Sequence, residues 1–206
     1  QLRLRLKFRM ADSSESESSD VVPQWDELDS KRIADCRIFD VFSKRFRHPE
    51  HGTEGDFYVI ETRDWVNVVP ITEDYRMVLV NQFRFGVKRT SWEIPGGVME
   101  NGEEPINAGL RELKEETGYT TGKACLLGSV RPNPAIQSNI CHIVLAEQAR
   151  LTDGLDWDEH EEIVTKAFPI ETVYEMVKQG AIFHSLALNA LLLFYPHWEK
   201  IKARGR

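Results

Sequence analysis

The chain has 206 residues, 41% of them hydrophobic and 29% charged, which is enough to bury the core of one domain. Its formal net charge of −7 argues against a protein that holds nucleic acid through phosphate contacts, because such domains concentrate positive charge on one face. No apolar stretch approaches the length of a bilayer span, so no membrane association is expected.

Residues 1–22 are expected to be a disordered leader or tag. Leucine alternates with arginine or lysine up to Arg9, and Met10 then opens the run ADSSESESSD. A signal peptide needs a continuous apolar core and a small-residue cleavage site, which this segment lacks. The favoured interpretation is a vector-derived or untranslated leader before a start at Met10. A membrane-surface anchor is the alternative, but nine residues bury little apolar area.

Alternating apolar and polar residues predict two strands in the first third of the chain, at Arg37–Phe46 and Gly55–Thr62. The sequence HPEHGTEG between them is typical of a turn. We expect residues 23–62 to form a small N-terminal β annex and residues 63–200 to form the main domain.

The main domain begins with further strands, which are predicted at Trp65–Ile71, Arg76–Gln82 and 91–95. The first two flank TEDY, a hairpin-like connection. The third leads into Gly96 and Gly97, which allow close approach of a metal ion or phosphate to the backbone.

The sequence then changes to helical periodicity over residues 104–117. Pro105 suits the first helical turn and Gly118 suits a left-handed C-terminal position. Four residues spaced by four, three and four positions predict a buried stripe: Ile106, Leu110, Leu113 and Thr117.

The remaining elements are strands at Ala124–Val130, Ile140–Glu147 and Val164–Phe168, and helices at 170–178 and 185–195. Mixed strands with few helices predict an α/β (α+β) sandwich built on a mixed sheet.

The three cysteines, Cys36, Cys125 and Cys141, are odd in number and widely spaced, with no CxxC pair and no histidine cluster. This pattern predicts buried free thiols rather than zinc ligands or disulfides. It also predicts a cytoplasmic protein, because the cytosol is reducing.

Glu112, Glu115 and Glu116 lie at i, i+3 and i+4, which places their carboxylates on one helix face. Within residues 97–119, six glutamates face only Arg111 and Lys114, a net charge of −4. Like charges at this spacing destabilise a bare helix, so divalent cations are expected to compensate them. Gly109, on the same face, leaves room either for a ligand or for packing against a strand, and the sequence does not decide between the two.

The segment GGVMENGEEPINAGLRELKEETGY resembles the Nudix box: glycine, five residues, glutamate, seven residues, then Arg-Glu-aliphatic-x-Glu-Glu-x-Gly-hydrophobic. All fixed positions match: Gly97, Glu103, Arg111, Glu112, Leu113, Glu115, Glu116, Gly118 and Tyr119. The resemblance implies the Nudix fold, in which a mixed sheet lies between helices, and hydrolysis of a nucleoside diphosphate linked to another moiety.

The resemblance also assigns roles to the matching residues. Glu112 and Glu116 are the main metal ligands, assisted by Glu115 and the carbonyl of Gly96, and Arg111 orients the glutamates. Glu103 contacts the same network. Two or more Mg²⁺ or Mn²⁺ ions are expected.

Outside the box, VNQFRFG (80–86) and WEIPGG (92–97) are similar to the ADP-ribose and nucleoside diphosphate sugar branch. The resemblance makes Arg84 a phosphate or ribose contact, with Gln82 and Pro134 also at the substrate. Alternatively, Arg84 is a surface residue of its strand. Members of this branch commonly form homodimers through N-terminal strands. Four aromatic residues suit either such an interface or an internal core: Trp25, Phe39, Phe42 and Trp65.

The acidic segment WDEHEEI (157–163) resembles the catalytic loop of that branch, in which a glutamate activates the attacking water. Glu159 is the first candidate for this base and Glu161 the second, with Glu162 third. A solvated acidic loop without a catalytic role is the alternative.

Asn139 departs from the pattern, because ADP-ribose-specific relatives commonly have an acidic residue there. The substrate is therefore expected to be ADP-ribose or another nucleoside diphosphate sugar, with dinucleoside polyphosphates and a non-catalytic nucleotide sensor as alternatives. Asn133, Gln137, Asn139 and His142 are candidates to contact the terminal moiety, although a strand histidine is more often a hydrogen-bonded residue of the partial core.

Overall fold

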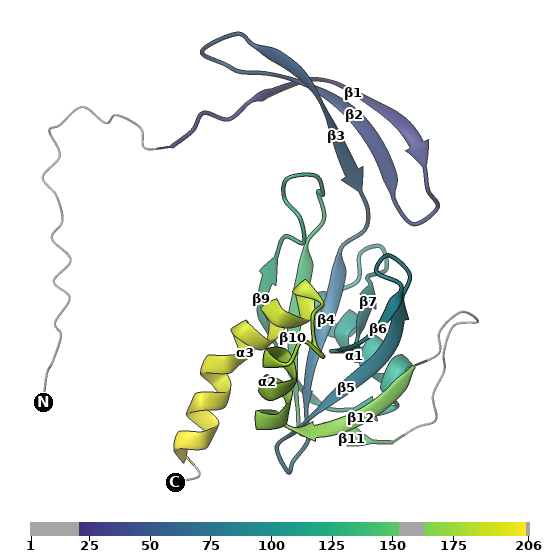
Figure 1. The fold of residues 1–206 in the computed structure, drawn as a ribbon, viewed down its shortest axis with the longest axis vertical. Helices are drawn as coiled ribbons and strands as arrows, with labels where there is room; N and C mark the ends of the chain where they lie inside the picture. Colours follow the sequence, from purple (N-terminus) through teal and green to yellow (C-terminus); the bar gives the residue numbers. More distant parts are fainter. Residues whose placement is uncertain (1–20, 153–162, 205–206) are drawn as a thin grey trace, which may run out of the picture.

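The computed structural model describes residues 21–152 and 163–204 (Figure 1). Almost all of the predicted leader 1–22, and the three candidate bases Glu159, Glu161 and Glu162, lie outside these ranges. No helix in the described ranges is long and apolar enough to cross a membrane.

A seven-stranded mixed sheet forms the centre of the main domain. Its strands run in the order β12-β5-β4-β10-β9, with β6 paired to β5 and β7 paired to β4. The strands are β4 (Trp65–Ile71), β5 (Arg76–Arg84), β6 (Arg89–Glu93), β7 (Gly96–Val98), β9 (Lys123–Val130), β10 (Cys141–Glu147) and β12 (Val164–Pro169). β4 and β10 are parallel and the other pairs are antiparallel, so the predicted mixed sheet is confirmed.

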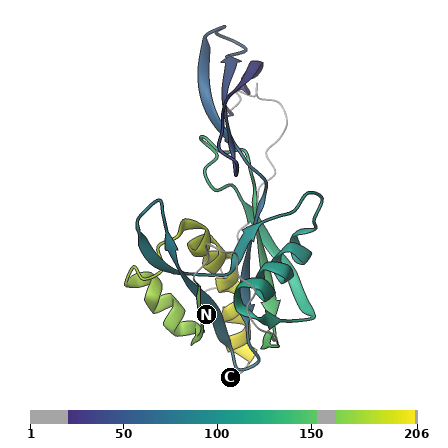
Figure 2. The same ribbon diagram turned by 90° about the vertical axis from the view of Figure 1, so that its right-hand side faces the viewer.

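Helices cover both faces of this sheet. Figure 2 shows α1 (Pro105–Thr117) and α2 (Ile170–Lys178) on opposite sides, and α3 (Ser185–Arg204) packs on the α2 side. The period of two in β4 explains the division, because Val66 and Val68 pack toward α1 whereas Val69 and Ile71 pack toward α2 and α3. The predicted sandwich is confirmed.

The site-bearing helix α1 begins and ends where the sequence predicts. Pro105 occupies the first turn, and Gly118 has a φ of 71° with its N–H donated to the carbonyl of Lys114 at 2.8 Å. The predicted buried stripe is only partly right: Leu113 and Thr117 are buried, but Ile106 and Leu110 are half-buried. The reason is that Ala108 and Gly109 face the sheet instead.

Gly109 packs against strands rather than leaving space for a ligand. A Cβ at this position would lie 3.2 Å from side-chain atoms of Val144 and Val68, so β10 and β4 approach α1 closely here. This close packing fixes the distance of α1 from the sheet.

Helix α3 is longer than predicted, since it continues through Pro196 to Arg204. A proline inside a helix removes one backbone hydrogen bond, so by itself Pro196 would favour an end near residue 195, where the helix was predicted to end. Phe194 and Trp198 are both buried against the core, and this packing keeps the helix intact on both sides of the proline.

A separate three-stranded antiparallel sheet precedes the main domain and extends away from it (Figures 1 and 2). It consists of β1 (Asp26–Asp35), β2 (Asp40–Arg47) and β3 (Glu54–Glu61). The two strands predicted in this region are present. β1 was not predicted because DELDSKRIAD shows no sustained alternation, and it is held by its pairing with β2.

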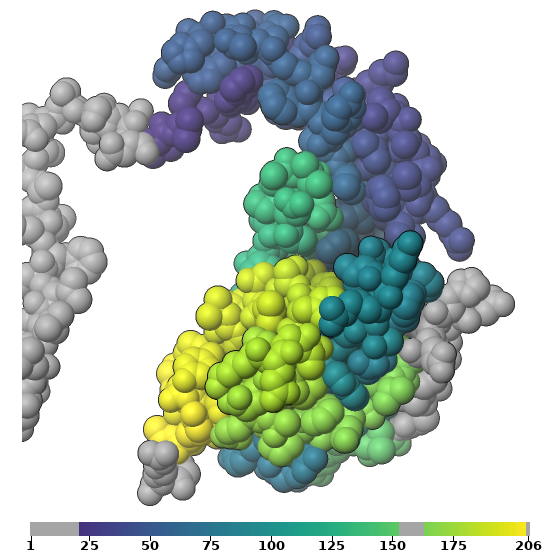
Figure 3. Space-filling view, in the orientation of Figure 1, coloured from purple at the N-terminus to yellow at the C-terminus, as the bar shows by residue number. Residues whose placement is uncertain are grey.

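The segment between β9 and β10 connects the two parts of the molecule. In Figure 3 it projects from the main body toward the N-terminal sheet. The N–H of Ile60 donates to the carbonyl of Ile136 at 2.7 Å, and Ile60 forms a parallel bridge with Gln137. A further two-stranded sheet pairs β8 (Tyr119–Thr120) with β11 (Arg150–Leu151).

The prediction of three buried thiols is wrong for two of them. All three cysteines are free, but only Cys141 is buried, and burial raises the pKa of its thiol to about 12. Cys36 lies between β1 and β2, and Cys125 lies on the edge strand β9, so both are exposed.

Candidate active site

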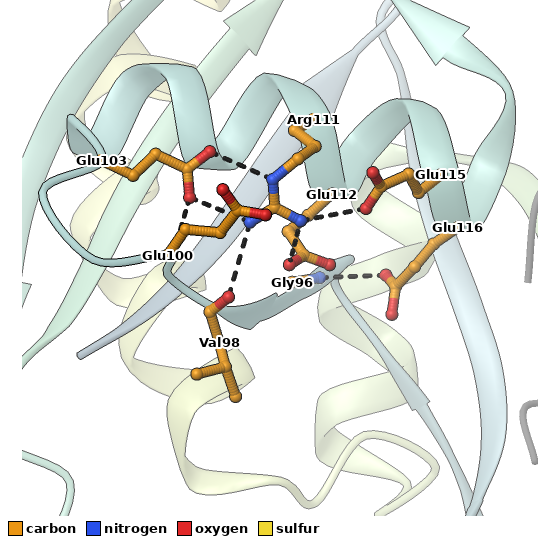
Figure 4. Close-up of polar contacts among 8 residues, drawn as sticks. All are labelled: Gly96, Val98, Glu100, Glu103, Arg111, Glu112, Glu115 and Glu116. Carbon is orange, nitrogen blue, oxygen red and sulfur yellow. Dashed lines mark hydrogen bonds and ion pairs between the residues drawn. The ribbon is translucent and has the colours of Figure 1, made fainter. Parts of the chain in front are cut away.

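Two glutamates of α1 and one that precedes this helix are gathered around Arg111 (Figure 4). Nη1 of Arg111 donates to Oε1 of Glu112 at 2.8 Å and to Oε2 of Glu115 at 3.0 Å. Nε and Nη2 donate to the two carboxylate oxygens of Glu103, each at 3.0 Å. The pKa of Arg111 is raised, first by its hydrogen bond to Glu103, so this guanidinium remains charged while it holds three carboxylates together.

Two of the site glutamates, Glu116 and Glu112, lie against the glycines of β7. Oε2 of the buried Glu116 accepts the N–H of Gly96 at 3.0 Å. The carboxylate of Glu112 lies beside Gly97, where a Cβ would be 2.5 Å from Oε2 and 2.6 Å from Oε1. A Cβ at Gly96 would collide with the carbonyl of Val66. Bare backbone at Gly97 therefore lets the carboxylate of Glu112 reach β7, and at Gly96 it lets β7 lie close to β4.

We expect Gly97→Ala to reduce hydrolysis by roughly a hundredfold, because its methyl group would displace the carboxylate of Glu112 by about 1 Å. Initial rates with Mg²⁺ measure the loss, and circular dichroism checks that the variant is folded. Gly86→Ala is the matched control, since a Cβ there meets no atom of the described residues within 4 Å. Equal activity of the two variants would contradict the importance of this contact.

The carboxyl pKa of Glu103 is lowered from 4.5, chiefly by its hydrogen bond to Arg111. A carboxyl pKa that is lower in the folded state than in the unfolded state stabilises the folded protein at pH values above the unfolded-state pKa of about 4.5. This stabilisation is lost as the pH falls through the folded-state pKa. We expect the difference in unfolding free energy between the wild type and Glu103→Gln to shrink below pH 4.5. Urea unfolding at pH 7, 5 and 4 measures it, and a difference that is constant with pH would contradict this origin.

The donor set of the site fits hard divalent cations. Glu112, Glu115 and Glu116 provide carboxylate oxygens from α1, and Gly96 provides a carbonyl from the adjacent β7. Such oxygens are the ligands that Mg²⁺ and Mn²⁺ prefer. Within residues 21–152 and 163–204, no three His, Cys, Asp or Glu side chains form a ready-made metal cluster. In the described residues Arg111 holds two of the carboxylates, so the roles of these ligands stay predictions.

A pocket of about 500 Å³ opens beside the same glycines. Its lining comes from the main sheet, from the N-terminal sheet and from the start of α3. Polar residues of the lining include Asn67, Arg84, Gln137 and His184, and apolar ones include Phe39 and Trp65. A pocket of this size that is lined by Gly96 and Gly97, the glycines that Glu116 and Glu112 contact, is suited to one end of a nucleotide-sized substrate.

Arg84 lines this pocket and is also bound to a buried acid. Its Nε and Nη2 donate to the carboxylate of Glu93 at 3.0 and 2.6 Å, and Glu93 is only 2% exposed. Glu93 was not predicted as a site residue, although it is the glutamate of the WEIPGG motif. The orientation of Arg84 thus depends on Glu93.

The other predicted substrate residues are dispersed. Gln82 is half-buried on β5 and Pro134 is exposed, and neither lines the pocket. Asn139 is buried beneath the turn, and its Nδ2 donates to the carbonyl of Arg63 at 3.4 Å. Of the candidates in this turn, Gln137 reaches the pocket.

His142 follows the more common alternative for a strand histidine. It lies half-buried on β10, and its Nδ1 forms a hydrogen bond of 2.9 Å with the hydroxyl of Ser129. The sequence did not identify His184 as a pocket residue, because a single histidine before a helix carries no motif.

Comparison with known proteins is consistent with this geometry. The NUDIX domain profile matches residues 61–189. The chain is 30% identical to the ADP-ribose pyrophosphatase of Bacillus subtilis (strain 168) over 170 residues, 80% of this chain and 91% of that protein. It is 31% identical to the methanol dehydrogenase activator of Bacillus methanolicus over 129 residues, 61% of this chain and 69% of that protein.

A crystal structure of an ADP compounds hydrolase has a similar fold, with a TM-score of 0.79 at 24% sequence identity. The likeness covers 90% of this chain and all of that one. At this identity the likeness concerns the fold alone.

Proposed function

The chain belongs to the Nudix family of pyrophosphohydrolases, and on that premise we propose that it hydrolyses ADP-ribose or a related nucleoside diphosphate sugar. The products are a nucleoside monophosphate and a sugar phosphate. The observation that carries the proposal is the carboxylate array of α1, held by Arg111 against the glycines of β7 beside a pocket of about 500 Å³. The resemblance to the Bacillus subtilis enzyme supports the substrate.

Nudix hydrolases use divalent metal ions such as Mg²⁺, and we propose two or more of them at this site. Bound there, the ions supply charge neutralisation and lower the pKa of a water molecule. Glu112 and Glu116 would hold them, with Glu115 and the carbonyl of Gly96 as additional ligands. Arg111 holds these carboxylates together and orients them, because it pairs with Glu112, Glu115 and Glu103.

The chain itself positions the substrate and removes the proton. Arg84 is suited to a phosphate oxygen of the substrate, since guanidinium matches phosphate geometry. The pocket walls keep water from one end of the substrate. A glutamate of the segment 157–163, Glu159 before Glu161, is proposed to take the proton from the attacking water. Neither glutamate lies in the described residues.

We also propose a cytoplasmic homodimer with residues 23–62 at its interface. Large apolar side chains of the N-terminal sheet are exposed, and they are Leu28, Ile33, Phe57 and Tyr58. A second copy that covered them would remove apolar surface from water. Of the four predicted interface aromatics, Trp65 and Phe39 line the pocket and Trp25 packs edge-on against Phe57. Light scattering during gel filtration distinguishes a dimer from a monomer, and a clean monomer would exclude this assembly.

A substrate panel tests the activity. We expect ADP-ribose with Mg²⁺ to yield AMP and a sugar phosphate, so that inorganic phosphate appears only after a phosphatase is added. EDTA should abolish the reaction, and Mg²⁺ or Mn²⁺ should restore it. Turnover of dinucleoside polyphosphates alone would favour the second candidate specificity. Binding of nucleotides without any hydrolysis would favour a sensor.

A further inference from the structure

The buried carboxylate of Glu93 is paired with Arg84, the residue proposed to bind substrate. Its two oxygens accept hydrogen bonds from Nε and Nη2 of Arg84. If the guanidinium of Arg84 turns toward a substrate phosphate, at least one of these bonds must break. Because Glu93 is only 2% exposed, water cannot replace the lost hydrogen bond. The movement of the guanidinium therefore weakens substrate binding unless another donor takes the place of Arg84.

His184 lies in position to be that donor. Its Nδ1 is 3.9 Å from Oε2 of Glu93, the same oxygen that Nη2 of Arg84 contacts at 2.6 Å. Nδ1 is buried, and the described part of the chain provides it with no hydrogen-bond partner. A buried ring nitrogen without a partner is uncommon and calls for a functional explanation.

The backbone around His184 is fixed, so that the imidazole need only rotate to reach Glu93. The carbonyl of His184 accepts the N–H of Leu188 at 3.1 Å in the first turn of α3. The preceding Phe183 lies under the guanidinium of Arg89 at 4.3 Å. Leu186, two residues later, is buried in the core.

The surroundings of His184 keep its imidazole neutral while Arg84 is hydrogen-bonded to Glu93. Burial lowers the pKa of the imidazole; the nearby Glu93 raises it, and Arg84 lowers it further. The positive end of the α3 dipole acts in the same direction as burial. A neutral imidazole with its proton on Nδ1 is still a hydrogen-bond donor, so no change of charge is required for the exchange.

We propose that His184 is a positioning residue for Arg84, and that its Nδ1–H hydrogen-bonds Oε2 of Glu93 when Arg84 turns to a phosphate of the substrate. The inference rests on the proposed function, because it assumes a phosphate-bearing substrate in the pocket that Arg84 and His184 both line. His184 acts through Glu93 and Arg84 rather than on the reacting atoms.

Steady-state kinetics with ADP-ribose and Mg²⁺ give the first test. His184→Phe removes the donor but keeps a planar ring, and we expect KM to rise roughly tenfold while kcat changes less than about twofold. His184→Gln provides an amide donor and should restore KM to within about threefold of the wild type. An unchanged KM in His184→Phe would overturn the proposal.

The variant Glu93→Gln separates this role from direct contact with the substrate. The neutral amide at position 93 carries no buried charge to compensate, so His184→Phe should raise KM less than about twofold in the Glu93→Gln background. A full tenfold effect in that background would mean that His184 acts on the substrate itself, which contradicts the proposal. Thermal unfolding of each variant checks that it is folded.

A measurement without substrate keeps the two proposals distinguishable. Arg84→Met leaves Glu93 without its guanidinium, which imitates the turn of Arg84. NMR titration of the imidazole signals, assigned by loss of one signal in His184→Phe, should show the pKa of His184 about one unit higher in Arg84→Met than in the wild type. An unchanged pKa would overturn the exchange. If the wild type hydrolyses nothing in the panel, the proposed function fails, whereas this titration still decides the partnership of His184 and Glu93.

Discussion

Replacing Glu116 by glutamine is expected to reduce kcat/KM with Mg²⁺ by at least about a hundredfold, because a lost metal ligand removes several kcal/mol of transition-state stabilisation. The side chain is only 5% exposed, and its Oε2 accepts the N–H of Gly96. The amide oxygen of glutamine can still accept this bond. The variant therefore removes the charge with little change in shape, and the fold should survive.

Initial rates of substrate hydrolysis over a range of Mg²⁺ concentrations measure this effect. Glu104→Gln is the matched control, since it makes the same change of charge at an exposed residue just before α1. Within the described part of the chain, the side chain of Glu104 makes no capping bond to this helix. We expect the control to retain nearly full activity. If Glu116→Gln hydrolyses the substrate as fast as the control with Mg²⁺ present, Glu116 is not a metal ligand.

Replacing Arg111 by glutamine is expected to affect both stability and activity. Arg111 donates to Glu103, Glu112 and Glu115, and its side chain is 27% exposed. Removal leaves three carboxylates close together without their shared cation, which should destabilise the metal-free protein by about 2 kcal/mol. Activity should fall by roughly a hundredfold, because Glu112 is no longer held in place.

The same variant makes a prediction about metal binding. In the wild type, Arg111 relieves the repulsion between the carboxylates. In Arg111→Gln, cations that bind the carboxylates relieve part of this repulsion instead. Mg²⁺ should therefore raise the unfolding temperature of Arg111→Gln more than that of the wild type. Calorimetry with and without Mg²⁺ measures both shifts. Arg111→Lys keeps the charge but cannot bridge three carboxylates, so it should recover only part of the stability. Equal Mg²⁺ shifts in all three proteins would show that the ions do not bind at this cluster.

The local elements of the site were predictable because each depends on neighbours in the sequence. Pro105 and Gly118 delimit α1, and the spacing of Glu112, Glu115 and Glu116 fixes their common face. The contacts of Arg111 with Glu112 and Glu115 follow from the same helix. The sequence also predicted strand β4 with its limits at Trp65 and Ile71.

Elements whose stability comes from distant residues were not predictable in this way. β1 has no alternation of its own and exists through its ladder with β2. The end of α3 depends on the packing of Trp198, which outweighs the local cost of Pro196. The exposure of Cys125 depends on the place of β9 at the edge of the sheet.

The sequence alone determined the glutamate-rich helix and its boundaries, and it indicated the family of the chain. Helical geometry and motif spacing are local properties, which is why they could be predicted. Only the tertiary structure decided which residues surround the pocket, since Phe39, Arg84, Gln137 and His184 come from four distant segments. It also revealed that Arg84 is paired with the buried Glu93, and that the nearby Nδ1 of His184 has no hydrogen-bond partner among the described residues. The physical reason is that a carboxylate excluded from water must find its partners through space, and no spacing along the chain encodes them.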